Sequence, residues 1–420
     1  MPTQTPETIV AFLQSFDLNA VENGQASLSS GTTIIDVAEV AGHSVPRYTN
    51  EYWTAKQRQA SNIQEISYRA CFKPQLPGFF IRHLTNPGDT IYDPFSGRGT
   101  TPLEAGLLGR KVIANDINPL SKILTEPRFF VPNIEDVRER LLSIPGDPSA
   151  HADRDLSMFY HPSTESEIVS LRQYLLSRVA EGTVDHLDQW IRMVATNRLT
   201  GHSPGFFSVY TLPPNQAVSP GRQIKINKTR SQTPPYRSVH NIILKKSKSL
   251  IKGVTEQEIC HLQEAGRTAR FFTSDARQTS EIPDNSVMLT VTSPPFLDIV
   301  QYSGDNWLRC WFNGIDSDEV AKKISHHRRL DDWASVMGDV FLELYRITCM
   351  GGFVAFEVGE LRKGSIRLDE TVVPLGCSAG FDCMGIIINS QNFTKTANIW
   401  GVSNMEGGTN TNRIVLFRKD

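Results

Sequence analysis

Two glycines follow a short extended run in the first quarter of the chain. The run Thr90–Asp93 continues as Pro-Phe-Ser-Gly97-Arg-Gly99-Thr-Thr101. A strand that stops in a turn with two glycines lets backbone N–H groups approach a ligand closely, and a following helix directs its positive end at the same place. Such loops bind anions or carboxylates, although a Gly-rich turn can also be structural punctuation. The usual dinucleotide pattern and a phosphate-loop Gly-Lys-Ser/Thr are missing, so neither NAD nor ATP is favoured.

A second polar segment, Asn115 to Pro119, follows the apolar run Val112–Ala114. A carboxylate at the position of Asp116 could accept hydrogen bonds from both hydroxyls of a ribose, as in other sheets that bind nucleosides. A helix N-cap would have the same sequence, and the two interpretations are balanced until the glycine turn is added. Asp275, which precedes Ala276 and Arg277 after a third extended run, offers another acceptor at the same sheet edge.

The third segment is Thr292-Ser293-Pro294-Pro295-Phe296, directly after an apolar strand. Two consecutive prolines cannot continue a strand ladder and have no N–H, so their carbonyls point out without forming regular structure. A rigid strand terminator is the simpler interpretation. The position at the top of a sheet favours a functional site instead.

The elements around the first two segments are predicted from their spacing. Apolar residues from Pro74 to Leu84 recur at helical spacing. Thr90–Asp93, Thr101–Leu108 and Val112–Ala114 then form a strand, turn, helix, strand unit.

Helical patterns dominate from Asn133 to Ala269. They are interrupted by the Pro-rich basic stretch Ser203–Pro235, which we predict as loop with short extended pieces. Later strands are predicted at Arg270–Thr273, Val287–Thr292, Phe353–Glu357, Met384–Ile388 and Arg413–Phe417, with a helix at Trp333–Ile347.

This order predicts an α/β fold, with a doubly wound, mostly parallel sheet and an antiparallel C-terminal strand. The sheet domain is divided between residues 51–132 and 271–420. Residues 133–270 form an inserted helical and loop subdomain. Residues 1–50 have weak periodicity and many Ser, Thr and Gly, so we predict a loosely packed N-terminal lead-in.

Acidic residues are missing from the centre of the insertion. No Asp or Glu occurs between Asp188 and Glu256, although 45 acidic residues in 420 would place roughly seven there. Such a run is usually a solvated face, but a surface that faces phosphates would also exclude acids. The net charge of −2 argues neither for nor against a nucleic-acid partner. The run contains the basic residues Arg192, Arg198, Arg222, Lys225, Lys228, Arg230, Arg237, Lys245, Lys246, Lys248 and Lys252.

Composition excludes disordered, collagen-like and disulfide-scaffold proteins. With 39% hydrophobic and 21% charged residues, the chain is typical of globular proteins. The six cysteines are scattered without zinc-ligand spacing, so we expect reduced thiols and no metal site. The N-terminus does not resemble a signal peptide, and no run approaches the ~20 apolar residues of a membrane span. We therefore expect a cytoplasmic protein.

Together these segments resemble the amino-methyltransferase family of DNA methyltransferases. Asp93–Thr101 resembles the loop that binds S-adenosylmethionine (SAM), and Ser293–Phe296 resembles the catalytic tetrapeptide. Tyr68–Leu76 is similar to the segment that packs on the methionine part of SAM. Leu344–Gly352 is similar to a later core motif, and Gly401–Phe417 to the final loop and strand. The resemblance covers roughly the catalytic half of the chain.

The resemblance implies a class I SAM-dependent methyltransferase with a Rossmann-like fold that acts on double-stranded DNA. Ser-Pro-Pro-Phe/Tyr is associated mainly with cytosine N4 and Asp-Pro-Pro-Tyr with adenine N6, so Ser293 points to cytosine. A restriction endonuclease that acts separately is a further candidate partner, and the oligomeric state stays open. The candidate SAM-binding residues are Tyr68, Phe72, Lys73, Asp93, Phe95, Gly97, Gly99, Thr100, Thr101, Asp116, Asp275 and Ala276. The candidate DNA-binding residues are Arg198, Arg222, Lys225, Lys228, Arg230 and Arg237.

The expected chemistry follows from the amine. An exocyclic amine is a poor nucleophile because its lone pair is delocalised into the ring. We expect the Ser293 hydroxyl and the Pro294 carbonyl to accept hydrogen bonds from the N–H groups of the amine. We expect Pro295 to help hold these two acceptors rigidly. Phe296 would stack on the flipped base, which is worth ~1–3 kcal/mol. Positioning beside an electrophilic methyl can supply roughly 7–11 kcal/mol without a metal or general base. Carbon-5 methylation is disfavoured because no cysteine lies near Pro294.

Alternatives remain at this point. The same chemistry could act on adenine N6 in DNA, on a guanine amine in RNA or on a glutamine amide in protein. A non-catalytic DNA-binding protein that retains the fold is a rival of another class, and the intact Asp93, Gly97, Gly99, Asp116 and Ser293 argue against it. The insertion lies between the second and third cofactor motifs, which departs from the common motif orders. Its role in target recognition therefore rests on charge alone.

Overall fold

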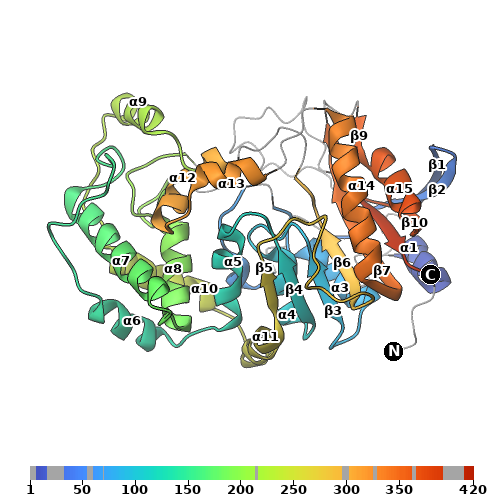
Figure 1. The fold of residues 1–420 in the computed structure, drawn as a ribbon, viewed down its shortest axis with the longest axis horizontal. Coiled ribbons are helices and arrows are strands. Elements are labelled where there is room, and N and C mark those ends of the chain that lie inside the picture. Colours follow the sequence, from blue (N-terminus) through green and yellow to red (C-terminus); the bar gives the residue numbers. More distant parts are fainter. Residues whose placement is uncertain are drawn as a thin grey trace, which may run out of the picture.

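The computed structural model describes residues 6–16, 33–53, 60–69, 71–212, 216–295, 302–324, 329–361, 366–390 and 411–420. Through these residues runs a nine-stranded sheet with the order β1-β2-β10-β11-β7-β6-β3-β4-β5 (Figure 1). The strands from β7 to β5 pair in parallel, whereas β11 runs antiparallel to β7 and β10. The strands are β1 Ile34–Val40, β2 His43–Asn50, β3 Thr90–Asp93, β4 Lys111–Asn115, β5 Arg270–Phe272, β6 Val287–Thr292, β7 Thr348–Val358, β10 Asp382–Ser390 and β11 Thr411–Arg418, with a separate pair β8 Glu360–Leu361 and β9 Ile366–Arg367.

Helices cover both faces of the sheet because its central strands are apolar on both sides. On β7, Phe353 and Ala355 contribute to one hydrophobic cluster, and Val354 and Phe356 contribute to another. The first cluster includes side chains of α3 Gln75–Leu84, α4 Thr100–Leu107 and α11 Glu256–Thr268, and the second those of α14 Leu330–Ile347 and α15 Leu368–Ser378. The predicted doubly wound α/β sheet with an antiparallel C-terminal strand is confirmed.

The insertion forms a helical group beside the sheet, on the left of Figure 1. Trp190 and Ile243 are fully buried and belong to the same hydrophobic cluster as Leu289 of β6, so the helices share a core with one sheet face. The helices here are α6 Ile134–Ser143, α7 Pro162–Ala180, α8 His186–Arg198, α9 Pro220–Arg230 and α10 Val239–Ile251. Other helices are α5 Leu120–Thr125, α12 Tyr302–Phe312 and α13 Ser317–Lys323, with 3-10 turns at Asn62–Gln64 and Glu126–Phe129.

The prediction of a loop over Ser203–Pro235 was wrong for α9. Ser219 caps this helix by accepting a hydrogen bond from the backbone N–H of Arg222, and Pro220 occupies its first turn. Of its residues only Gln223 is buried, so the helix carries no apolar stripe that periodicity could detect.

The expectation of a loosely packed lead-in does not hold for residues 34–50. They form the hairpin β1–β2, and β2 pairs in parallel with β10, which extends the main sheet. Ala38, Val40 and Val45 are buried there. Before the hairpin, α1 Pro6–Ser15 packs Ile9 and Leu13 into the core. In the part of the chain that the structure describes, no helix is long and apolar enough to cross a bilayer.

Candidate active site

The glycine loop begins at Asp93, where β3 ends. The Asp93 carboxylate accepts hydrogen bonds from the Phe95 backbone N–H at 3.1 Å and from the Thr292 hydroxyl at 2.6 Å. Because the carboxyl is almost fully buried, its pKa rises to about 7. Asp93 thus joins the carboxyl ends of β3 and β6 and fixes the glycine loop against the strand that carries Ser293.

The two glycines are required by the path of the backbone. Gly97 and Gly99 have φ angles of 53° and 81°, in the left-handed region. A Cβ on Gly99 would lie 2.3 Å from the Oγ1 atom of Thr125, so no side chain fits there. The Gly97 backbone N–H donates to the Asp116 carboxylate at 2.8 Å. The loop is therefore closed onto the end of β4.

Asp116 stands where a ligand could reach its carboxylate. Besides Gly97, it accepts a hydrogen bond from the Asn118 backbone N–H at 2.9 Å. Burial raises its pKa to about 6, although these two bonds lower it. The neighbouring Asn115 amide donates to the carbonyls of Pro94 at 3.3 Å and Ser274 at 2.9 Å. One amide thus holds together the segments that follow β3, β4 and β5.

After β5, Asp275 and Arg277 form an ion pair. The Arg277 guanidinium donates to both carboxylate oxygens of Asp275, with Nη2 2.7 Å from Oδ2 and Nε 3.0 Å from Oδ1. The hydrogen bonds from Arg277 lower the pKa of Asp275. A ligand at this edge would therefore meet a carboxylate that is already ionised and oriented.

Ser293, Pro294 and Pro295 leave the end of β6 together. The Pro295 carbonyl accepts a hydrogen bond from the indole Nε1 of Trp333 at 3.0 Å, and Trp333 is buried on α14. This hydrogen bond from α14 fixes the position of Pro295. Phe296 lies outside the described residues.

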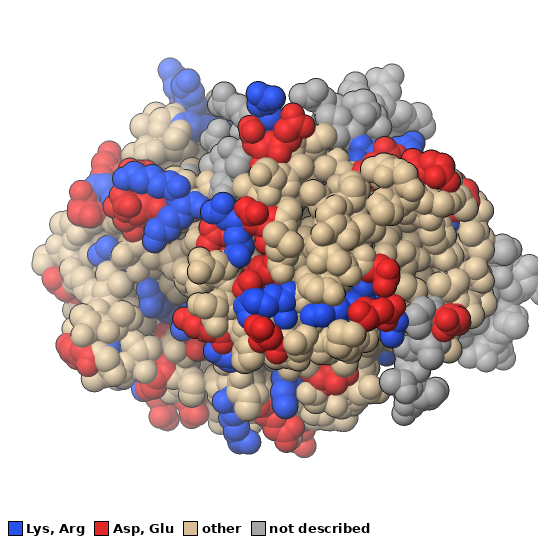
Figure 2. Space-filling model, turned by 45° about the vertical axis from the view of Figure 1, so that its right-hand side comes forward, with Lys and Arg blue, Asp and Glu red and all other residues tan. Residues whose placement is uncertain are grey.

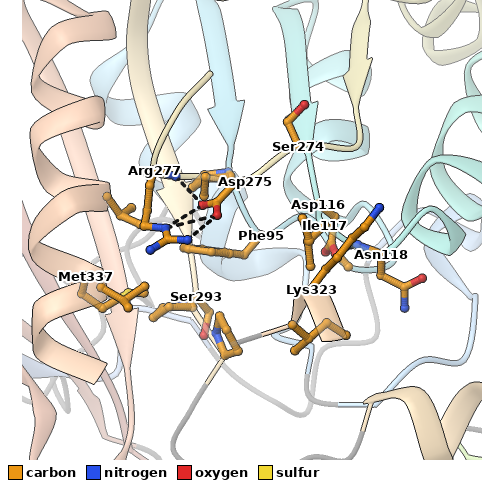
Figure 3. A pocket seen from close by; sticks show the side chains of 18 of the residues that line it. Phe95, Asp116, Ile117, Asn118, Ser274, Asp275, Arg277, Ser293, Lys323 and Met337 are labelled. Carbon is orange, nitrogen blue, oxygen red and sulfur yellow. Dashed lines mark hydrogen bonds and ion pairs between the residues drawn. The ribbon is translucent and has the colours of Figure 1, made fainter. Parts of the chain in front are cut away.

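These segments enclose one pocket of about 930 Å³, including its open mouth. Figure 3 shows Asp116 and Asn118 on one side of it and Ser293 and Met337 on the other. Nine of the predicted residues line the pocket: Tyr68, Phe95, Gly97, Asp116, Asp275, Ala276, Ser293, Pro294 and Pro295. Among the described residues, no group of three or more His, Cys, Asp or Glu could hold a metal ion.

Other candidate SAM-binding residues do not line this pocket: Phe72, Lys73, Asp93, Gly99, Thr100 and Thr101. Three of them support it from behind, since Asp93 and Gly99 shape the loop and the Thr101 hydroxyl donates to the Val291 carbonyl at 3.1 Å. Lining residues that the candidate set omitted are Pro94, Ile117, Asn118, Ser274, Arg277, Lys323, Ile324, Val336, Met337 and Val340. Those on α13 and α14 carry no motif, and only the fold brings them to the pocket.

Known proteins resemble a part of the chain that contributes to this pocket. A family model described as DNA methylase, of the N6 and N4 type, matches residues 30–124. This segment is therefore similar to the DNA methylases. It includes the glycine loop and Asp116, so the resemblance to amino-methyltransferases is confirmed there.

Curated relatives that match part of the chain are Type II methyltransferases. M.BsoBI of Geobacillus stearothermophilus is 43% identical over 67 residues, which are 16% of this chain and 13% of that protein. M.PvuII of Proteus hauseri is 37% identical over 82 residues, which are 18% of this chain and 24% of that protein. The chain thus spans less than a quarter of the length of these relatives. Among solved structures, the rRNA methyltransferase aviRa from Streptomyces viridochromogenes is 13% identical, with 88% of this chain and 96% of that chain covered. The TM-score is 0.34, and no argument about fold or function rests on this likeness.

Beyond the methylase segment, the candidate DNA-binding residues separate into two groups. Arg222, Lys225 and Lys228 are exposed on α9. One face of α9 is fixed to the insertion, because Gln223 donates to the Tyr210 carbonyl at 3.0 Å and Asn227 donates to the Met158 carbonyl at 2.7 Å. At 100° per residue the three basic side chains lie away from that face.

Arg198 and Arg237 are held within the fold, which corrects the expectation for these two, whereas Arg230 is exposed and stays a candidate. Arg198 is buried, with its guanidinium 4.0 Å from the ring centroid of Phe206. The Arg237 guanidinium donates to the carbonyls of three residues, among them Phe206 at 2.8 Å. Arg230 lies over the Tyr210 ring at 3.8 Å. Charge counting missed the role of Arg198 because burial cannot be seen in a charge run.

Basic character is local rather than general. Lys and Arg side chains are interspersed with Asp and Glu on the face shown in Figure 2. Figure 1 shows α9 on the same side of the molecule as α12 and α13, and the end of α13 lines the pocket through Lys323. A long polyanion that reached the pocket from this side could also meet α9.

Proposed function

We propose that this protein is a DNA methyltransferase that transfers a methyl group from SAM to the exocyclic N4 of a flipped cytosine. The observation that carries the proposal is that Ser293, Pro294 and Pro295 line the same pocket as Gly97 and Asp116. The acceptors for an amine and the loop for a cofactor therefore face one space. The match of residues 30–124 to the DNA methylases supports the same conclusion.

The pocket suits SAM in the chemistry of its lining. Its lining combines carboxylates with apolar side chains, as cofactor sites do. The carboxylate of Asp116 can accept hydrogen bonds from ribose hydroxyls, and Asp275 offers a second acceptor for an adenine amine. Phe95 and Ile117 supply apolar surface for a ring. A Cβ added to Gly97 would lie 3.7 Å from the nearest side-chain atom, which belongs to Tyr68, so a ligand can approach the backbone there.

The chain's own residues then orient the target amine. Bound SAM supplies a methyl group made electrophilic by a positively charged sulfur. The Ser293 hydroxyl oxygen and the Pro294 carbonyl accept hydrogen bonds from the two N–H groups of the amine. These hydrogen bonds turn the lone pair of the amine out of conjugation with the ring. Trp333, which holds the Pro295 carbonyl at 3.0 Å, keeps the diproline from moving. Orientation of this kind is the main contribution that such a site needs.

DNA is the proposed substrate because of α9. Its outward face carries Arg222, Lys225 and Lys228 in a region free of acidic residues. Neutralising phosphates supplies most of the sequence-independent affinity for DNA. The insertion of residues 133–270 is proposed as the DNA-recognition region, with α9 as its contacting element.

The base is tested by incubating the protein with methyl-labelled SAM and unmodified genomic DNA, then analysing the nucleosides by mass spectrometry. We expect label in N4-methylcytosine. Label in N6-methyladenine would replace cytosine by adenine in the proposal, and label in RNA or protein alone would overturn DNA as the substrate. SAM binding without transfer to any of them would favour a non-catalytic DNA-binding role.

A further inference from the structure

Glu357 and Asn412 lie beside Ser293 along the edge of the sheet, on the neighbouring strands. The strands lie in the order β6, β7, β11, and the register pairs Thr292 with Phe356 and Glu357 with Ile414. Side chains alternate between the two faces of a strand. Ser293, Glu357 and Asn412 each lie two residues from a member of the same hydrophobic cluster, namely Val291, Ala355 and Ile414. All three therefore project from one face, at the end where the pocket opens.

Glu357 is a buried carboxyl, with 8% of its surface exposed. Its Oε1 atom accepts a hydrogen bond from the Asn412 side-chain amide at 3.1 Å. Burial is the largest influence on the pKa of Glu357 and raises it. Hydrogen bonds from the Ser293 and Asn412 side chains lower the pKa in part. Among the described residues its partners are neutral, and a buried carboxyl without a charged partner is costly, so its presence beside the pocket calls for a function.

Charged groups on the packed elements are turned elsewhere. Arg413 of β11 forms an ion pair with Asp369 at 2.7 Å, and its neighbours in the strand, Asn412 and Ile414, project from the opposite face. Asp93, on the far side of β6, is bonded to Thr292 and to the Phe95 backbone. Within the described residues, the pKa of Glu357 is influenced by burial, Ser293 and Asn412 and by no charged group.

We propose that Glu357 is a positioning residue that takes up, through Ser293, the proton that methylation leaves on the amine. This inference rests on the proposed function. The ionised Glu357 accepts the Ser293 hydroxyl proton, so the oxygen lone pairs of Ser293 are turned toward the amine. When the methylated amine gives its surplus proton to Ser293 Oγ, the hydroxyl proton of Ser293 passes to Glu357. Glu357 becomes a neutral carboxylic acid and releases the proton to solvent after the product leaves.

Pairing of Ser293 with Glu357 is tested without any turnover. The carboxyl of Glu357 is titrated by NMR in full-length protein with ¹³C-labelled glutamate, and Glu357→Gln identifies its signal. Ser293→Ala should raise the pKa of Glu357, because the hydroxyl no longer stabilises the carboxylate. Thr290→Val is the matched control, since Thr290 lies on the same strand, projects from the other face and has a hydroxyl without a hydrogen-bond partner among the described residues. Equal pKa values in Ser293→Ala and wild type would overturn the pairing.

The role in methyl transfer is tested with Glu357→Gln in single turnovers at saturating SAM and DNA. Glutamine keeps a carbonyl that accepts the Ser293 hydroxyl but cannot take a proton. We expect the rate to fall on the order of 10²-fold, with unchanged SAM affinity and without the wild-type rise in rate with pH. A wild-type rate and pH profile in the variant would overturn the role of Glu357. If the wild type methylates no base amine, the proposed function fails, and the NMR titration still decides whether the two side chains are paired.

Discussion

In the pocket, Asp116 is fixed by two backbone N–H groups, whereas Arg222, Lys225 and Lys228 on α9 extend into solvent. The pocket residues follow strand ends that buried hydrogen bonds tie to one another. The face of α9 opposite its basic residues is attached to the insertion through amide side chains such as Gln223. One region is organised before a ligand arrives, and the other presents charge on an adaptable surface.

This difference separates two kinds of recognition. A small cofactor and a single amine need groups placed within a fraction of an ångström, which buried strand ends provide. A phosphate backbone needs charge at roughly the correct distance, and lysine and arginine side chains can move to meet it. Substitutions in the pocket should therefore act through geometry, and substitutions on α9 should act through charge.

Gly99→Ala should break the pocket most severely. The left-handed φ of 81° costs roughly 1–2 kcal/mol for alanine, and the clash with Thr125 at 2.3 Å adds about 1–3 kcal/mol. Gly88→Ala is the matched control, because Gly88 has a φ of 89° and a Cβ added to it would meet nothing within 4 Å. Urea unfolding should show Gly99→Ala to be the less stable of the two. Equal unfolding free energies would mean that the loop relaxes freely and is not rigid.

Asp116→Asn should weaken SAM binding by about 10- to 100-fold, equivalent to roughly 1.5–3 kcal/mol for hydrogen bonds to a charged group. The amide cannot accept from Gly97 and Asn118 with both of its ends, as the carboxylate does at 2.8 and 2.9 Å. Asp89→Asn is the control, since Asp89 accepts from the Asn86 N–H at the opposite end of β3. Calorimetric titration with SAM gives both affinities, and an unchanged affinity in Asp116→Asn would remove Asp116 from the site.

Replacing Arg222, Lys225 and Lys228 together by alanine should weaken DNA binding and flatten its dependence on salt. Each lost phosphate contact changes the slope of log K against log salt by about 0.9, so the slope should fall by up to about 2.7. The matched control replaces Lys245, Lys248 and Lys252, which are exposed basic residues in the same acid-free run. If both triple variants bind DNA with the same slope, the charge acts without regard to position and α9 is not the contacting element.

The same contrast explains what could be predicted from the sequence. The glycine loop and Asp116 were found because their function depends on the backbone next to them, which local residue types determine. Met337 and Glu357 were missed because each reaches the site only after distant strands or helices pack together. Arg198 was assigned to DNA because its burial depends on the packing of the insertion, which a count of charges does not contain.

Asp93 should reveal the burial of the strand ends behind the pocket through a pH effect on stability. Its pKa in the folded protein, about 7, exceeds the ordinary value of 3.8, because burial disfavours the carboxylate. Between these pH values the folded state holds a proton that the unfolded state releases, so Asp93 makes the protein less stable as the pH rises from about 4 to 7. The slope can reach about 1.4 kcal/mol per pH unit. In Asp93→Asn, which keeps an oxygen to accept from Thr292, this contribution should disappear, and the variant should gain stability relative to wild type as the pH rises. A difference in unfolding free energy that does not change between pH 4 and 7 would show that the end of β3 admits enough water to hold an ordinary carboxylate.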